Sequence, residues 1–273
     1  MIAPLDALIL AGGASRRMGS DKALLEWEGR PATLRLRELL SGFVERVRLS
    51  RAVGQELPEG WSESDAVRDR EIAAGPLRGI LSALAAHPGR AFLVVAVDQP
   101  LLDTSMLASL VDARDPGLGA TCFLDSDGSL PDPMCAIYEP SFSDAASPWL
   151  SHGKGCPRKV LLNSPVKVLP SPGIRLKDAD SPQDQAEIVR WMEGRQVTLE
   201  HFALLCDLAK VPSETVSTRA VDLTGLWRET ADRLAIGFPM DSFRPVRNDA
   251  FAEWSDSFAA GDRISFLPPV SGG

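Results

Sequence analysis

Short apolar runs alternate with amphipathic stretches over the first two-thirds of the chain. Residues 7–10 and 91–97 are apolar without alternation, as expected for strands that are covered on both faces. Residues 31–44 place their leucines at helical spacing, and a strand over 44–49 and a further helix over 75–86 are predicted after them. This order of strands and helices predicts an α/β fold with a mostly parallel sheet and right-handed crossovers.

The pattern changes after residue 194. A predicted helix over 182–192 ends at Glu193-Gly194-Arg195, which has the composition of a helix stop and a short linker. Beyond it we expect strands over 197–205, 214–220, 245–249 and 262–267 and an amphipathic helix over 222–235. This order of elements is typical of a small α+β domain of the β-grasp, ubiquitin-like type. We therefore predict two domains, over residues 1–194 and 197–273.

Charge and cysteine content narrow the functional classes. The chain of 273 residues has a formal net charge of −8, which argues against broad nucleic-acid binding, because that function uses basic surfaces. The sequence has no apolar run as long as a membrane span and no charged-then-apolar leader, so we expect a soluble, cytoplasmic protein. Its four cysteines are widely spaced and are expected to be reduced thiols rather than metal ligands.

A glycine-rich turn follows the first predicted strand directly. Gly12 and Gly13 allow the backbone to turn sharply and approach a ligand, and Arg17 and Lys22 follow shortly afterwards. Backbone N–H groups and these cations suit an anion, so we expect a phosphate site. Lys22 stands three residues beyond Gly19, which does not fit a P-loop, and adjacent glycines do not fit the Gly-x-Gly-x-x-Gly fingerprint.

An acidic residue stands at the end of the predicted strand over 91–97. Asp98 would lie at the carboxyl end of a central parallel strand, where open α/β sheets bind ligands, and at the same edge as the glycine-rich turn. A strand-end aspartate is also a common helix N-cap, but Asp103, which precedes Thr104, is available for that role. The two features together favour a functional site at this edge.

The loop over residues 10–22 resembles the Leu-Ala-Gly-Gly-x-Ser-x-Arg-Met-Gly-x-Asp-Lys motif of nucleotidyltransferases, specifically the molybdenum cofactor guanylyltransferases of the MobA type. Gly-Pro-Leu-x-Gly over residues 75–79 and the Asp-x-Pro that begins at Asp98 are further motifs of that family. The resemblance implies a Rossmann-like nucleotidyltransferase domain. Such a domain would transfer GMP from GTP to molybdopterin or Mo-molybdopterin, with Mg²⁺ as the metal and pyrophosphate as the leaving group.

The resemblance also implies roles for individual residues. Arg17 and Lys22 would act in catalysis by offsetting the charge on the leaving pyrophosphate, and Asp98 would hold Mg²⁺, with Asp180 as a further ligand. The residues expected to bind the nucleotide are Leu10, Ala11, Gly12, Gly13, Lys22, Asp69 and Asp98. The positions that depart from the family are Ser50 and Asp180, where relatives often have Asn, and Asp132, where relatives often have His. Ser181 and Pro182 also predict a helix start directly after Asp180.

The C-terminal residues 261–273 resemble those of the molybdopterin synthase small subunit, the MoaD-type sulfur carrier. They end in Gly272 and Gly273, and two prolines upstream stiffen the approach to these flexible residues. The resemblance implies that Gly273 becomes a thiocarboxylate after activation by an E1-like adenylyltransferase. The large subunit of molybdopterin synthase would then receive the sulfur.

Three other functions remain open. Cytidylyl relatives resemble Leu-Ala-Ala-Gly at the loop, so transfer of CMP from CTP is one alternative, although Gly12 favours GTP. A sugar-phosphate nucleotidyltransferase is a second, which the C-terminal tail disfavours. The third is a catalytically inactive N-terminal domain that presents the sulfur carrier.

Overall fold

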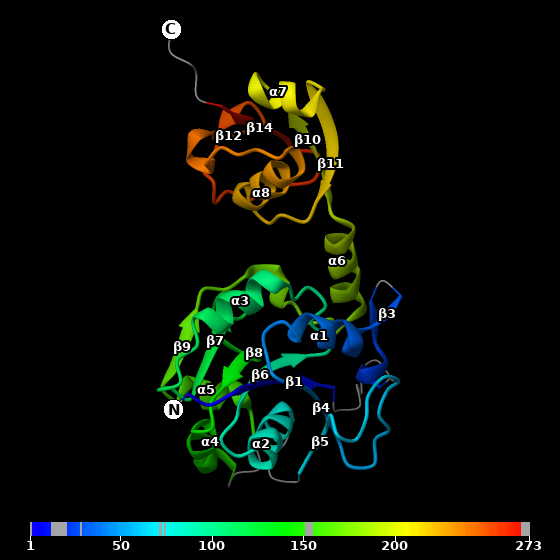
Figure 1. Cartoon of the computed structure of the whole chain (residues 1–273), viewed down its shortest axis with the longest axis vertical. Helices are drawn as coiled ribbons and strands as arrows, with labels where there is room; N and C mark the ends of the chain where they lie inside the picture. Colours follow the sequence, from blue (N-terminus) through cyan, green and yellow to red (C-terminus); the bar gives the residue numbers. More distant parts are fainter. Residues whose placement is uncertain are drawn as a thin grey trace. The chain divides into compact units, whose positions relative to one another are not determined.

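The computed structural model describes residues 2–11, 21–27, 29–70, 73, 75–150 and 155–268 (Figure 1). The chain divides into two compact units, Met1–Gln185 and Ala186–Gly273, and the division falls inside α6, Pro182–Glu193. Each unit has a sheet and a hydrophobic core of its own. In the part of the chain that the structure describes, no helix combines the length and the apolar composition needed to cross a membrane.

Unit 1 is built on a seven-stranded sheet with the order β5-β4-β1-β6-β8-β7-β9. β8 runs antiparallel to both of its neighbours, and the other pairs are parallel, so the predicted mostly parallel sheet is confirmed. The strands are β1 (Leu5–Leu10), β4 (Val47–Arg51), β5 (Ala66–Arg68), β6 (Ala91–Ala96), β7 (Ala120–Leu124), β8 (Pro131–Tyr138) and β9 (Val166–Leu169). Every residue of β1 and β6 is buried, as predicted for strands covered on both faces.

Helices cover both faces of this sheet. α1 (Ala32–Leu40) and α3 (Thr104–Asp112) lie on one face, and α2 (Pro76–Ala86) and α4 (Phe142–Leu150) lie on the other (Figure 1). α5 (Pro157–Leu162) packs into the same core as α2 and α4. The short elements of unit 1 are η1 (Lys22–Leu24), β2 (Glu26–Trp27), β3 (Arg30–Pro31) and η2 (Gly173–Leu176).

The helix predicted over residues 31–44 is too long at its C-terminal end. α1 ends at Leu40, where the Ser41 hydroxyl donates to the carbonyl of Arg37 (2.6 Å) and a turn follows. The next strand, β4, therefore begins only at Val47, three residues later than predicted.

The register of the strands determines which strand ends meet. Leu10, the last residue of β1, is aligned with Ser50 of β4 on one side and with Ala96 of β6 on the other. The N–H of Val97 also donates to the carbonyl of Leu10 (3.2 Å). The carboxyl ends of β1, β4 and β6 thus lie side by side, at the edge where such sheets bind ligands.

Unit 2 has a five-stranded sheet with the order β11-β10-β14-β12-β13, in which a parallel pair, β10 and β14, lies between antiparallel partners. α8 (Leu223–Leu234) packs on the sheet through Trp227, whose ring centroid lies 5.0 Å from that of Phe266. Asp222 caps this helix by accepting from the N–H of Gly225 (2.7 Å), and the helix predicted over 222–235 is confirmed. The remaining elements are β10 (Arg195–Glu200), α7 (Leu204–Ala209), β11 (Ser213–Thr218), η3 (Met240–Ser242), β12 (Arg244–Arg247), β13 (Ala250–Phe251) and β14 (Arg263–Leu267).

The strand predicted over residues 197–205 is wrong in its second half. Pairing between β10 and β11 stops at Glu200, and the backbone turns at Ala203, which has a φ of 46° and is the N-cap of α7. The apolar residues after this turn belong to the helix, in which Leu205 is fully buried in the core of unit 2.

Candidate active site

A cavity of about 380 Å³ opens at the carboxyl ends of the central strands of unit 1. The wall residues that matter below are Leu10, Lys22, Ser50, Asp69, Gly79 and Asp98. Four of these six were predicted from the sequence to bind the nucleotide. The register places Leu10 and Ser50 next to each other, while Asp69 follows β5 directly and Asp98 stands two residues after the end of β6.

Lys22 connects the two carboxylates that the sequence predicts as metal ligands. Its Nζ contacts the carboxylate of Asp98 and lies 3.1 Å from Oδ1 of Asp180. Burial alone lowers the pKa of Lys22, but the contacts with Asp98 and Asp180 outweigh burial and raise it. The side chains of Lys22 and Asp98 are largely covered, whereas that of Asp180 is 54% exposed.

The segment that carries Asp180 is tied to the end of β6. The N–H of Ala179 donates to the carbonyl of Asp98 (2.9 Å), and the buried side-chain amide of Gln99 donates to the carbonyl of Leu176 (3.4 Å). These bonds explain how residues far apart in the sequence reach one Lys22 ammonium group. Ser181 accepts from the N–H of Asp184 (3.2 Å) at the start of α6, so the predicted helix start is confirmed.

Asp178 lies close to the charged residues of this site, although it was not selected from the sequence. Its Oδ1 is buried and has no hydrogen-bond partner among the described residues. Burial and the charges of Asp98, Asp132 and Asp180 raise the pKa of Asp178 to about 7. Its position two residues before Asp180 was the only signal available.

Ser50 and Asp69 form a second polar pair in the cavity. The Ser50 hydroxyl donates to Oδ1 of Asp69 (2.6 Å), so the serine at this departure from the family orients the aspartate carboxylate. Gly79 lies opposite, where an added Cβ would come within 2.6 Å of both Leu10 Cδ2 and Ser50 Oγ. This close approach is a physical reason for the second glycine of the Gly-Pro-Leu-x-Gly motif.

The carboxylate of Asp132 accepts hydrogen bonds from backbone N–H groups of its own strand, β8. It is 5% exposed, and its Oδ1 accepts from the N–H groups of Met134 (2.6 Å) and Cys135 (3.1 Å). Burial raises the pKa of Asp132. Met134 itself lines the cavity, so the bonds from Asp132 shape the wall of the cavity at β8.

The remaining residues considered in the sequence analysis either lie outside the described residues or are not among those that line the cavity. Gly12, Gly13, Arg17, Gly272 and Gly273 lie outside the described residues. Ala11 is buried, and its carbonyl accepts from Nη1 of Arg51 (2.9 Å). Asp103 caps α3 by accepting from the N–H of Met106 (2.9 Å), so the N-cap role considered for Asp98 belongs to Asp103. The cysteines are free thiols, of which Cys122 and Cys135 are buried.

Comparison with known proteins gives relatives for unit 1. A 186-residue match with the "Molybdenum cofactor biosynthesis bifunctional protein" of Synechocystis is 32% identical; it covers 68% of this chain and spans about half (54%) of the relative. The "Molybdenum cofactor guanylyltransferase" of Shewanella halifaxensis is 30% identical over 56% of this chain and 77% of its own length.

A solved structure agrees on the fold. The molybdopterin-guanine dinucleotide biosynthesis protein A from Archaeoglobus fulgidus matches with a TM-score of 0.53 at 20% identity, over 67% of this chain and 95% of that protein. The similarity establishes the Rossmann-like nucleotidyltransferase fold for unit 1. Residues 7–168 also match the family described as the MobA-like NTP transferase domain, and this chain belongs to that family.

Proposed function

We propose that unit 1 transfers GMP from GTP to the phosphate of molybdopterin or Mo-molybdopterin and releases pyrophosphate. The observation that carries the proposal is the cavity at the carboxyl strand ends, where Lys22, Asp98 and Asp180 meet beside Ser50 and Asp69. The family of unit 1 and the guanylyltransferases among its relatives support the same reaction.

The donor set of the site fits Mg²⁺. The described residues contain no group of three or more His, Cys, Asp or Glu side chains placed to hold a metal ion. Mg²⁺ in phosphoryl-transfer sites needs only one or two carboxylates, since phosphates and waters complete its shell. Asp98 and Asp180 both reach Lys22 Nζ, and Asp178 has a carboxylate oxygen without a partner among the described residues. When bound, Mg²⁺ would neutralise phosphate oxygens and hold them in place.

The protein's own contribution would be positioning and charge. An oxygen of the acceptor phosphate attacks the α-phosphorus of GTP, and the bond from that phosphorus to the oxygen bridging to the β-phosphate breaks. Lys22 would turn from Asp98 to the phosphates and offset the charge that develops on pyrophosphate. Gly12, Gly13 and Arg17 would contribute as the sequence predicts.

The nucleoside would lie toward Asp69. The hydroxyl of Ser50 occupies one carboxylate oxygen of Asp69 (2.6 Å), which leaves the other oxygen to accept N–H groups from a base. Leu10, Ser50 and Gly79 form the adjoining wall of the cavity, against which the flat ring would pack. Guanine has two neighbouring N–H donors on one edge, so a carboxylate at this place suits guanine.

Calorimetry and turnover test the nucleotide and the reaction. We expect the full chain to bind Mg·GTP more tightly than Mg·CTP, Mg·ATP or Mg·UTP, and to release pyrophosphate from GTP only when molybdopterin is present. Tighter binding of CTP would assign the protein to CMP transfer. Binding of GTP without molybdopterin-dependent turnover would favour the inactive domain that presents a carrier.

We further propose that unit 2 is a β-grasp, ubiquitin-like sulfur carrier. Its central parallel pair β10–β14 with α8 packed on the sheet is the arrangement expected for that fold. β14 ends at Leu267 and leads directly into the terminal segment with Gly272 and Gly273. An E1-like partner would adenylate the Gly273 carboxylate, a sulfur donor would displace AMP, and the thiocarboxylate would pass its sulfur to the large subunit of molybdopterin synthase.

Intact-mass measurement tests the carrier. Chain purified from cells that make molybdopterin should show a fraction in which one oxygen is replaced by one sulfur, and deletion of Gly273 should abolish this fraction. An added residue after Gly273 should also block sulfur transfer, because it shifts the reacting carbon by about 3.5 Å. Normal molybdopterin in cells that depend on the chain without Gly273 would refute the carrier role.

A further inference from the structure

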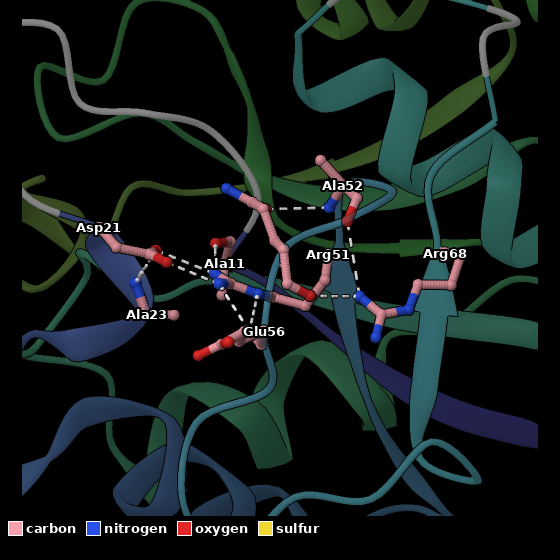
Figure 2. A network of polar contacts seen from close by, with 8 residues as sticks. Ala11, Asp21, Ala23, Arg51, Ala52, Glu56 and Arg68 are labelled. Atoms are coloured by element: carbon pink, nitrogen blue, oxygen red, sulfur yellow. Dashed lines mark hydrogen bonds and ion pairs between the residues drawn. The ribbon is translucent and has the colours of Figure 1, made fainter.

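Arg51 is a buried cation that stands between two wall residues of the cavity, Ser50 and Ala52. All of its N–H groups donate hydrogen bonds within the protein. It is the last residue of β4 and is 2% exposed. Its Nη1 donates to Asp21 Oδ1 (2.9 Å) and to the carbonyl of Ala11 (2.9 Å), and its Nη2 donates to Asp21 Oδ2 (2.6 Å). Nε and Nη2 donate to the carbonyl of Glu56 at 3.1 and 2.8 Å (Figure 2).

These contacts use every N–H of the guanidinium group. Arginine has five such donors in a fixed plane, and the five bonds of Arg51 account for all of them. An arginine near a predicted phosphate site would ordinarily be considered a phosphate ligand. Arg51 has no donor left for that role unless it gives up a bond within the protein.

Two of the hydrogen-bond partners of Arg51 flank the same segment of the sequence. Ala11 and Asp21 stand immediately before and after residues 12–20, which contain the glycine-rich turn. Asp21 is also the N-cap of η1, because its Oδ1 accepts from the N–H of Ala23 (3.0 Å). η1 begins at Lys22, so the ion pair of Arg51 lies one residue from the ammonium group that contacts Asp98.

We propose that Arg51 is a positioning residue of the transfer reaction: it holds together the two ends of residues 12–20 and fixes η1, so that Lys22 faces the cavity. The proposal rests on the function proposed above for unit 1. The hydrogen bond from Arg51 is the main reason that the pKa of Asp21 is lowered, so Asp21 remains an anionic partner at neutral pH. Lysine cannot replace Arg51, since an ammonium group cannot bind a carboxylate and two carbonyls in one plane.

Arg68 provides a matched control. It extends from the neighbouring strand β5 and donates to the carbonyls of Gln55 (2.7 Å) and Ala52 (3.5 Å), in the same connection that contains Glu56 (Figure 2). In the described structure Arg68 has no hydrogen bond to Ala11 or Asp21. Arg68→Met therefore loosens the connection after β4 without releasing the ends of residues 12–20.

Kinetics of the full chain test the inference. We expect Arg51→Lys and Arg51→Met to lower kcat for GMP transfer by about 10- to 100-fold, because a displaced catalytic group costs that much. Arg68→Met should change kcat by less than about two-fold. In a Lys22→Ala background, Arg51→Met should lower kcat by only about two- to three-fold more, because both changes remove the same contribution. A full, multiplicative loss in that background would overturn the inference.

Chemical labelling of Lys22 gives a readout that needs no activity. Reductive methylation, followed by mass spectrometry of the Lys22 peptide, should proceed several-fold faster in Arg51→Met than in the wild type and unchanged in Arg68→Met. An unchanged rate in Arg51→Met would overturn the inference, even if GMP transfer fails in all variants and the proposed function is wrong. If Arg51→Met does not fold, as judged by circular dichroism, Asp21→Asn replaces it and the same increase is expected.

Discussion

Replacing Asp178 by asparagine should make the stability of unit 1 less dependent on pH. Burial and the neighbouring carboxylates Asp98, Asp132 and Asp180 raise the pKa of Asp178 from 3.8 to about 7 in the folded protein. The folded state therefore binds this proton more tightly than the unfolded state. Stability conferred by the proton is complete below the unfolded pKa and is lost as the pH rises through the folded pKa.

The size of the effect follows from the two pKa values. One pH unit between the folded and unfolded pKa corresponds to about 1.4 kcal/mol, so a change from 3.8 to about 7 amounts to about 4 kcal/mol above neutral pH. About 2.5 kcal/mol of this loss falls between pH 5 and pH 8. The amide of Asp178→Asn does not ionise, so the variant should gain that amount relative to the wild type over this interval.

Urea unfolding in EDTA at pH 5, 6, 7 and 8 measures the difference. The change should appear in the transition of unit 1 and be absent from that of unit 2. Asp184→Asn is a suitable control, because Ser181 and Lys177 lower the pKa of Asp184, which is therefore ionised throughout this range. Wild type and Asp178→Asn with parallel stability curves would show that Asp178 is not a buried acid beside other carboxylates.

Further variants probe the cavity and the core of unit 2. Asp98→Asn should lower GMP transfer by at least about 100-fold with the melting temperature retained, as measured by pyrophosphate release. Gly79→Ala should weaken Mg·GTP binding by about ten-fold in calorimetry, because its methyl group would lie 2.6 Å from Leu10 Cδ2 and Ser50 Oγ. Trp227→Ala should destabilise unit 2 by about 3–5 kcal/mol in urea unfolding and leave nucleotide binding unchanged, since this tryptophan is 3% exposed within the core.

Strands buried on both faces were predictable because burial on both faces requires a continuous apolar run, which can be seen in a short stretch of sequence. β1 and β6 consist almost entirely of apolar residues, and the structure buries every one of their residues. The strand predicted over 197–205 was too long because the apolar residues after Glu200 were assigned to it, whereas pairing ends at Glu200 and the chain turns at Ala203 into a helix. A turn of this kind in a non-glycine residue has no local sequence signal.

Some residues of the candidate site were predictable from the sequence and others were not. Asp98 was predictable, because the end of a central parallel strand is a place that topology alone defines. Asp178 was not, since its burial depends on the bond that ties Ala179 to the carbonyl of Asp98, far away in the sequence. Arg51 was not predictable either: it stands in one strand with Arg48, and only its distant partners distinguish the two arginines.

The contacts of Lys22 give a physical reason why an acidic chain would accept a triphosphate under the proposed function. The formal net charge of −8 is a sum over the whole chain, and exposed charges farther away than about 10 Å are largely screened at physiological salt. Inside the cavity, one ammonium group holds Asp98 and lies 3.1 Å from Asp180, so both carboxylates already surround a cation. Under the proposed function, an entering phosphate would compete with them for Lys22, and each carboxylate that it displaced would be free to hold Mg²⁺. Binding would then depend on this local pairing of opposite charges, which the net charge of the chain does not reveal.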